Sequence, residues 1–333
     1  MKRVAVLLAL LASVTLPPAP GAAAEKIKIT IPAAAVTFAS LYHAKTAGYF
    51  AEEGLDVEIV TVAGGASLQA LIAKDAQFCV TPSTYQIQAW TKGQKLIATG
   101  SIMNRNAINV VMHKDVAKEK GITEKTPLAE KIKALKGLKL SGTAVGSFSY
   151  EVLVYYLLRA GIDPQKDVQL IGIGAGPAMA LALEQRKVDG FATGTPIPDA
   201  AVLRGYGVMI VDNAAGEDPE FAEFMMNSVL VHPDYAKQNP EIVRKVLRAL
   251  VKANAYVLDQ PIEKLVSSMK PFLGALDDKI LSTGLAKVKL GIRRGGRITE
   301  QASTLTQDFM RKIGQLKTTI PYTELVTHEY LPK

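Results

Sequence analysis

The sequence predicts an α/β fold in two similar lobes, with mostly parallel sheets and a ligand cleft between the lobes. The first observation is that strand-like and helix-like segments alternate from residue 26 to residue 232, which is typical of α/β architectures. The second is that a glycine–helix–strand stretch at 64–83 recurs 112 residues later. The third is size, because 333 residues with 48% apolar content can build two domains with separate cores.

The N-terminus has the features of a secretory signal peptide. Lys2 and Arg3 form a positive region, residues 4–16 are apolar, and a run of small residues follows. The apolar run is too short to span a bilayer, so we predict a signal peptide over 1–24 and a mature chain that begins at Glu25 in the periplasm. An uncleaved anchor is the alternative.

The net charge of +8 comes mostly from scattered basic residues, which argues against a nucleic-acid partner.

The first half of the mature chain is predicted to alternate strands with helices. Apolar and polar residues alternate in its opening segment, as in a strand with one buried face. The stretch at 64–83 opens with two glycines, continues as an apolar-periodic helix and ends as a short strand that stops at Thr81. The other expected elements are a helix at 38–50 and strands at 26–32, 55–62, 95–103 and 108–113.

The second half begins with a charged segment at 115–137 that is helical or irregular, and then resumes the alternation. A helix at 147–161 has Ser147 or Ser149 as its N-cap and a glycine at its end. A helix at 240–258 begins with Pro240 and places apolar residues on one face. The remaining expected elements are a helix at 177–187 and strands at 138–144, 167–174, 189–196, 206–212 and 227–232.

The recurrence aligns two strand ends that are rich in hydroxyl groups. Thr81-Pro82-Ser83 matches Thr193-Gly194-Thr195 without a gap, and the glycine pairs before the helices match as Gly64-Gly65 and Gly176-Pro177. Chance similarity between two generic βαβ units is the alternative. Ligands of open α/β sheets bind beyond the carboxyl ends of the strands, where helix N-termini offer N–H groups. Two such ends facing each other predict a binding cleft without acid–base side chains.

Three segments, at 42–60, 134–174 and 183–196, resemble periplasmic solute-binding proteins of the nitrate, taurine and alkanesulfonate group, which also includes binders of thiamine-pyrimidine precursors. The first segment, for example, has a helix that ends in Gly-Tyr-Phe, then an acidic pair, Gly-Leu and a strand. The resemblance implies the type II periplasmic-binding-protein fold, one small molecule bound between the lobes, and delivery to an ABC permease. The ligand contacts that it implies by position are Thr37, Phe38, Gly64, Gly65, Thr81, Pro82, Ser83, Ser147, Phe148, Ser149, Thr195 and Pro196.

The resemblance also implies how the lobes are divided and joined. The implied bounds are 25–106 plus 230–333 for lobe 1 and 107–229 for lobe 2. Two crossings, near 104–110 and 226–231, would act as a hinge that closes on the ligand. One departure concerns the turns at 74–77 and 186–189, where the family usually has Gly-x-x-Asp and this chain begins with Lys or Arg. The chain is therefore not a close copy of the best-known members, which leaves its ligand open.

The predicted function is ligand capture by the extracytoplasmic subunit of an ABC importer, not catalysis. Hydroxyl and N–H groups suit a small organic molecule with a polar or anionic head, such as a sulfonate, a carboxylate or a pyrimidine-like compound. Phe38 and Phe148 lie at matching positions, where each packs either on the ligand body or against its own lobe. We expect a monomer that docks on a permease in the inner membrane and needs no cofactor.

Two other functions stay open. A periplasmic sensor subunit that docks on a receptor would use the same cleft. A pyrimidine-synthesis-like enzyme is less well supported, because the related enzymes are implied to use a reactive Cys and Cys79 lies in an apolar run that predicts a buried thiol.

The glycines at 172–176 lack the spacing of a dinucleotide loop. No metal site is expected, since metal-ligand spacing is absent among His43, His113, His232 and His328.

Overall fold

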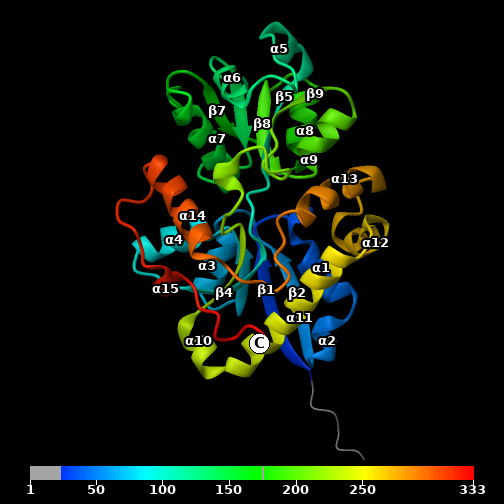
Figure 1. Ribbon diagram of the computed structural model, residues 1–333, viewed down its shortest axis with the longest axis vertical. Coiled ribbons are helices and arrows are strands. Elements are labelled where there is room, and N and C mark those ends of the chain that lie inside the picture. Colours follow the sequence, from blue (N-terminus) through cyan, green and yellow to red (C-terminus); the bar gives the residue numbers. More distant parts are fainter. Residues whose placement is uncertain (1–23, 175) are drawn as a thin grey trace, which may run out of the picture.

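The computed structural model describes residues 24–174 and 176–333, and it has two lobes, one above the other in Figure 1. The predicted signal peptide lies outside the described residues except for its last residue, Ala24. The first strand begins at Glu25. Lobe A, at the bottom of the figure, is built on one five-stranded sheet, and lobe B, at the top, on another. The described residues contain no helix that is long and apolar enough to cross a membrane.

Sheet A, the sheet of lobe A, has the strand order β2-β1-β3-β10-β4. β1 lies parallel to both β2 and β3, whereas β10 runs antiparallel to both of its neighbours, β3 and β4. Its central strand, β3, is buried along its whole length. The strand bounds are β1 Glu25–Ile31, β2 Leu55–Thr61, β3 Phe78–Thr81, β4 Ile97–Met103 and β10 Asn227–Val231.

Sheet B, the sheet of lobe B, repeats this plan with the order β7-β6-β8-β5-β9. β6 lies parallel to β7 and β8, and β5 runs antiparallel to β8 and β9. The strand bounds are β5 Ile108–His113, β6 Lys139–Gly142, β7 Gln169–Gly172, β8 Gly190–Gly194 and β9 Gly207–Val211. The two sheets therefore have the same order of parallel and antiparallel neighbours.

The two-lobed α/β fold is confirmed, but the sheets are mixed rather than mostly parallel. The antiparallel strand inside each sheet, β10 or β5, enters from the other lobe instead of through a helix of its own lobe. A strand that follows a crossover helix is held parallel to its predecessor, whereas a strand that arrives from elsewhere is free to run in the opposite direction. The alternation of segments predicts the first kind of connection and does not reveal the second.

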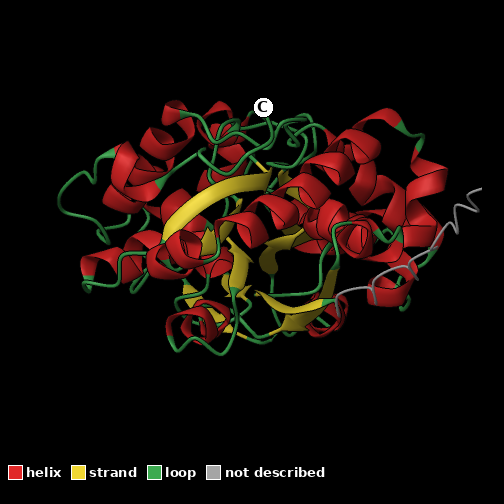
Figure 2. Cartoon of the chain, turned by 90° about the horizontal axis from the view of Figure 1, so that it is seen from below, coloured by secondary structure: helices red, strands yellow, loops and turns green. Residues whose placement is uncertain are grey.

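Helices cover both sheets, as Figure 2 shows from below. α11 packs on α1 and α2 and buries the apolar face that its sequence pattern predicts. The helices of lobe A are α1 Ala39–Thr46, α2 Tyr49–Glu52, α3 Ala66–Ile72, α4 Ser83–Thr91, α10 Pro233–Gln238, α11 Pro240–Asp259, α12 Ile262–Leu273, α13 Asp278–Lys289, α14 Glu300–Lys312 and α15 Tyr322–Leu325. Those of lobe B are α5 Lys114–Glu119, α6 Leu128–Lys133, α7 Phe148–Arg159, α8 Gly176–Glu184 and α9 Ile197–Leu203. Two 3₁₀ turns, Val36–Phe38 and Pro219–Phe221, complete the described elements.

The internal repeat has a structural counterpart in the turns before β3 and β8. Lys74 and Arg186, which are 112 positions apart, both have positive φ, at 66° and 58°. The repeat also holds at the end of each turn. The side chain of Gln77 accepts a hydrogen bond from the N–H of Lys28 at 2.8 Å, and Asp189 accepts one from Lys139 at 2.8 Å. The left-handed backbone explains why glycine suits the start of this turn.

Two segments join the lobes. The first runs from the end of β4 to the start of β5, within the predicted crossing at 104–110. The second connects β9 to β10 and so lies at 212–226, whereas the predicted 226–231 covers only the last residue of this segment and the whole of β10. The predicted lobe boundary at 229/230 falls inside this strand, all of which pairs in sheet A. The residue bounds of the lobes stay a prediction.

Candidate functional site

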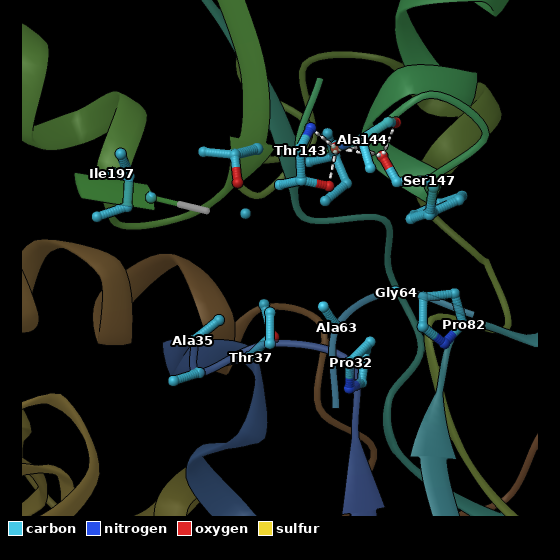
Figure 3. Close-up of a pocket in the computed structure, with 18 of the residues that line it drawn as sticks. Pro32, Ala35, Thr37, Ala63, Gly64, Pro82, Thr143, Ala144, Ser147 and Ile197 are labelled. Carbon is cyan, nitrogen blue, oxygen red and sulfur yellow. Dashed lines mark hydrogen bonds between the residues drawn. The ribbon is translucent and has the colours of Figure 1, made fainter. Parts of the chain in front are cut away.

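A cavity of about 310 Å³ lies between the two lobes and has walls from both. In Figure 3, Thr37 and Pro82 of lobe A lie on one side of it, and Thr143, Ser147 and Ile197 of lobe B lie on the other. The cavity sits beyond the carboxyl ends of the parallel strands. The residues that directly follow β1, β3, β6 and β8 all border it: Pro32, Pro82, Thr143 and Thr195. This is the place at which open α/β sheets bind ligands.

Ten of the twelve residues predicted as ligand contacts line this cavity. They come from five segments that are distant in sequence and that the fold brings together. Their role toward a ligand stays a prediction. The ten are Thr37, Phe38, Gly64, Gly65, Pro82, Ser147, Phe148, Ser149, Thr195 and Pro196.

Thr81 and Ser83 are not among the residues that line the cavity. Thr81 is the last residue of β3, is fully buried, and has a hydroxyl group without a hydrogen-bond partner in the described chain. Ser83 begins α4, and its hydroxyl donates to Ser228 Oγ of β10 at 2.8 Å. Both side chains therefore lie inside lobe A, and only Pro82, between them, reaches the cavity surface.

The N-terminus of α7 borders the cavity and is capped by its own loop. Ser147, the N-cap, accepts a hydrogen bond from the N–H of Tyr150 at 3.4 Å and donates its hydroxyl proton to the carbonyl oxygen of Ala144 at 2.7 Å. Ser149 accepts a hydrogen bond from the N–H of Thr143 at 3.0 Å. These serines hold the loop that precedes α7, as N-cap residues do.

Tyr85 is a cavity residue that the sequence reasoning missed. It lies on α4 in lobe A, and its hydroxyl oxygen accepts a hydrogen bond from the N–H of Phe148, the first residue of α7 in lobe B, at 3.0 Å. Burial raises the pKa of Tyr85 to about 12, so the hydroxyl is protonated at neutral pH. The available signal was its position in the first turn of the helix that follows Pro82.

Thr195, at the lobe B end of the cavity, is held by a buried carboxylate. Its hydroxyl donates to Asp199 Oδ2 at 2.5 Å, and Asp199 pairs in turn with Lys287 of α13 in lobe A. The same ammonium group lies 2.5 Å from Asp212 Oδ2. Burial lowers the pKa of Lys287, but the two carboxylates outweigh that effect and raise it above its ordinary value. Lys287 therefore remains charged and bridges the two lobes.

Phe38 and Phe148 both line the cavity, and each also packs within the protein. Phe38 lies 6.2 Å from Tyr42 between ring centroids. Phe148 lies 5.5 Å from Phe224 and 5.8 Å from Phe309, inside an aromatic cluster at the second crossing segment. Both rings are at least 96% buried. They form part of the apolar wall of the cavity.

The described lining contains no His, Cys, Lys, Arg, Asp or Glu. Cys79 is fully buried in β3, and desolvation raises the pKa of its thiol to about 11, which disfavours the reactive thiolate. The described residues also hold no cluster of three or more His, Cys, Asp or Glu that could bind a metal ion. The site offers hydroxyl groups, backbone groups and apolar walls, which suit binding better than acid–base chemistry.

A family model described as NMT1/THI5 like matches residues 35–264, more than half of the chain. Among curated proteins, YtlA of Bacillus subtilis is 25% identical over 319 residues, or 92% of this chain and 89% of YtlA. The riboflavin-binding protein RibY of Chloroflexus aurantiacus is 26% identical over 96% of this chain and 91% of its own. The 4-amino-5-hydroxymethyl-2-methylpyrimidine phosphate synthase THI11 of Saccharomyces cerevisiae is 25% identical over 67% of this chain and 64% of its own.

Solved structures share the fold of this chain. A protein from Bordetella bronchiseptica RB50 superposes with a TM-score of 0.78 at 22% identity, over 92% of this chain and 95% of its own. The periplasmic aliphatic sulphonate binding protein SsuA of Escherichia coli superposes with a TM-score of 0.69 at 19% identity, over 90% of this chain and 91% of its own. At these identities the likeness concerns the fold alone.

Proposed function

The chain belongs to the NMT1/THI5-like family, and from this premise we propose that it is the extracytoplasmic substrate-binding subunit of an ABC importer. It captures a small organic molecule with a polar head between its lobes. The observation that carries the proposal is the cavity itself, which both lobes line and which has no acid–base side chain among its described residues. A cavity of this volume accommodates a small organic ligand.

Capture proceeds by hinge closure. The lobes are joined by short segments at 104–107 and 212–226, and a ligand that touches both lobes makes more contacts when they are together. It therefore shifts the population toward the closed state. The names of two similar proteins support binding of a small organic molecule, because RibY is named for binding riboflavin and the structural neighbour SsuA for binding aliphatic sulphonates.

The predicted signal peptide supports export to the periplasm, where the mature protein begins at Glu25. There it acts as a monomer that delivers its ligand to a permease in the inner membrane. A sensor that docks on a receptor instead would have the same cavity, and neighbouring permease and ATPase genes distinguish the two roles.

An enzyme related to THI11 is the second candidate, favoured only by that sequence similarity. It lacks support in the cavity, where Cys79 is absent from the lining and no described side chain can act as a general base. An enzyme would return an altered compound after incubation, whereas a binding protein returns its ligand unchanged.

The test is a thermal-shift panel of small metabolites on the mature protein, because a ligand that binds only the folded state raises the melting temperature. Ala144→Trp fills the cavity from an exposed lining position and should abolish the shift given by every true ligand. Ala73→Trp, a matched change at an exposed position in lobe A away from the cavity, should preserve it. A panel without any hit that Ala144→Trp removes would refute the proposed function.

A further inference from the structure

The N-terminus of α7 would be the natural place for an anionic head in this cavity, because the first N–H groups of a helix lack intrahelical acceptors. Here the chain itself occupies three of the four. The N–H of Ser147 donates to the carbonyl oxygen of Ala144 at 3.1 Å, and that of Tyr150 donates to Ser147 Oγ at 3.4 Å. The N–H of Phe148, which borders the cavity, donates to the hydroxyl oxygen of Tyr85 at 3.0 Å.

Tyr85, which belongs to the other lobe, supplies the acceptor for the N–H of Phe148. It extends from α4 of lobe A and is 5% exposed, with its ring in the cavity wall. Its oxygen takes the position at Phe148 that an anionic oxygen would otherwise take. The hydroxyl proton of Tyr85 has no acceptor in the described chain, so the ligand meets one neutral O–H donor here in place of an N–H group at the positive end of the helix dipole.

The charges nearest the cavity are more negative than positive. Beneath Thr195 lie Asp199 and Asp212, which share the single ammonium group of Lys287. Glu151 lies in the first turn of α7, where burial raises the pKa of its carboxyl group to about 7, so the group is only partly ionised at neutral pH. No described lining residue is basic. An anion in the cavity would meet repulsion without a compensating cation.

The hydroxyl groups that face the cavity are uncharged and come from both lobes. Thr37 in lobe A and Thr193 in lobe B both line the cavity. Their hydroxyls make no hydrogen bond within residues 24–174 and 176–333, and each can donate or accept. Most of the remaining wall is apolar, including Phe38, Phe148 and Ile197.

We infer that the cavity selects an uncharged ligand with an apolar body and a few polar atoms, and that Tyr85 is the specificity-determining residue that excludes anionic heads. The inference rests on the proposed function and narrows its ligand class. It favours a neutral amide or heteroaromatic compound over a sulfonate or carboxylate of the same body.

The experiment compares matched pairs by isothermal titration calorimetry at pH 7.5: benzamide against benzoate, and propanesulfonamide against propanesulfonate. Wild-type protein should bind the neutral member of a pair at least about tenfold tighter, the size of one hydrogen bond to a charged group. Tyr85→Phe keeps the ring but frees the N–H of Phe148, so the preference should shrink by about tenfold or reverse. Tyr206→Phe, the same change at a buried lobe B residue that is not among those lining the cavity, should leave the preference unchanged.

The metabolite panel supplies the second readout, because each hit has a known charge at pH 7.5. Hits that are mainly uncharged, with a neutral preference that Tyr85→Phe reduces, support the inference. Anionic hits that Ala144→Trp removes, or tighter wild-type binding of benzoate or propanesulfonate than of the amides, overturn it and leave the proposed function standing. A preference for the amides that Tyr85→Phe does not change overturns the role of Tyr85. A panel without any specific hit refutes the proposed function, and the inference falls with it.

Discussion

A hydroxyl group at the edge of a cavity can hold the chain or hold the ligand, and its hydrogen-bond partners distinguish the two roles. The hydroxyl of Ser147 already donates to Ala144 and accepts from Tyr150, so its capacity serves the loop before α7. Thr37 and Thr193 have no such partners in the described chain. A sequence presents all three as equivalent polar residues, and only the positions of the neighbouring backbone groups separate them.

The variant Ser147→Ala should therefore lose stability, because Tyr150 N–H loses its cap. N-cap serines contribute about 1 kcal/mol, and we expect a loss of about that size in the free energy of unfolding measured with urea. Ser267→Ala is the control, since Ser267 is exposed within α12 and bonds only a carbonyl of its own helix. Equal stability of the two variants would contradict the capping role.

The turns before β3 and β8 show what a local sequence pattern encodes at the level of elements. Each turn follows a helix, contains a residue in the left-handed region and ends in a side chain that accepts a hydrogen bond from the neighbouring strand. The periodicity of the segments predicted these helices and strands. The antiparallel direction of β5 and β10 was not predictable, because it depends on pairing with strands that are more than 75 residues away in sequence.

The variant Lys74→Gly should stabilise the protein, because a non-glycine residue at a φ of 66° is strained. Part of the gain is lost to the greater freedom of glycine in the unfolded chain, so we expect a net increase of roughly 0.5–1 kcal/mol in the free energy of unfolding. Lys74→Ala removes the same exposed side chain without relieving the backbone and should give no increase. If the alanine variant were as stable as the glycine variant, backbone strain would not be the cause.

At the scale of the whole molecule, a buried acid lies where the lobes meet. Glu151 of α7 is 2% exposed and accepts a hydrogen bond from Gln88 Nε2 of α4 at 2.8 Å. Burial raises its pKa to about 7. The folded-state pKa thus lies above the unfolded value, so Glu151 contributes stability at low pH, and this contribution is lost as pH rises from about 4.5 to about 7.

The difference in unfolding free energy between Glu151→Gln and wild type should therefore rise with pH, by roughly 1–3 kcal/mol between pH 5 and pH 8. Burial lowers the pKa of His43, His113 and His328, which gives the opposite trend, but both proteins share those histidines. Urea unfolding at four pH values provides the comparison. A difference that stays constant over this range would show that Glu151 titrates normally in the folded protein.

The location of the cavity was predictable because the repeat within the chain places two strand ends at one cleft, and ten of its residues are among those that the family resemblance implies by position. The roles of Tyr85 and Lys287 were not predictable, because each residue contacts the opposite lobe. Tyr85 contacts Phe148, and Lys287 contacts Asp199. Such contacts depend on how the two lobes meet. Neither periodicity nor spacing within one unit specifies that geometry.

The bridge from Lys287 to Asp199 and Asp212, together with the bond from Phe148 to Tyr85, also bears on the kinetics of capture. These contacts involve only groups of the chain itself, so they must break and re-form each time a molecule enters. The lobes must then open before a ligand can bind. The apparent affinity for the ligand decreases as the closed fraction of the free protein increases. At high ligand concentration the observed association rate should reach a plateau set by the opening rate rather than increase with diffusion.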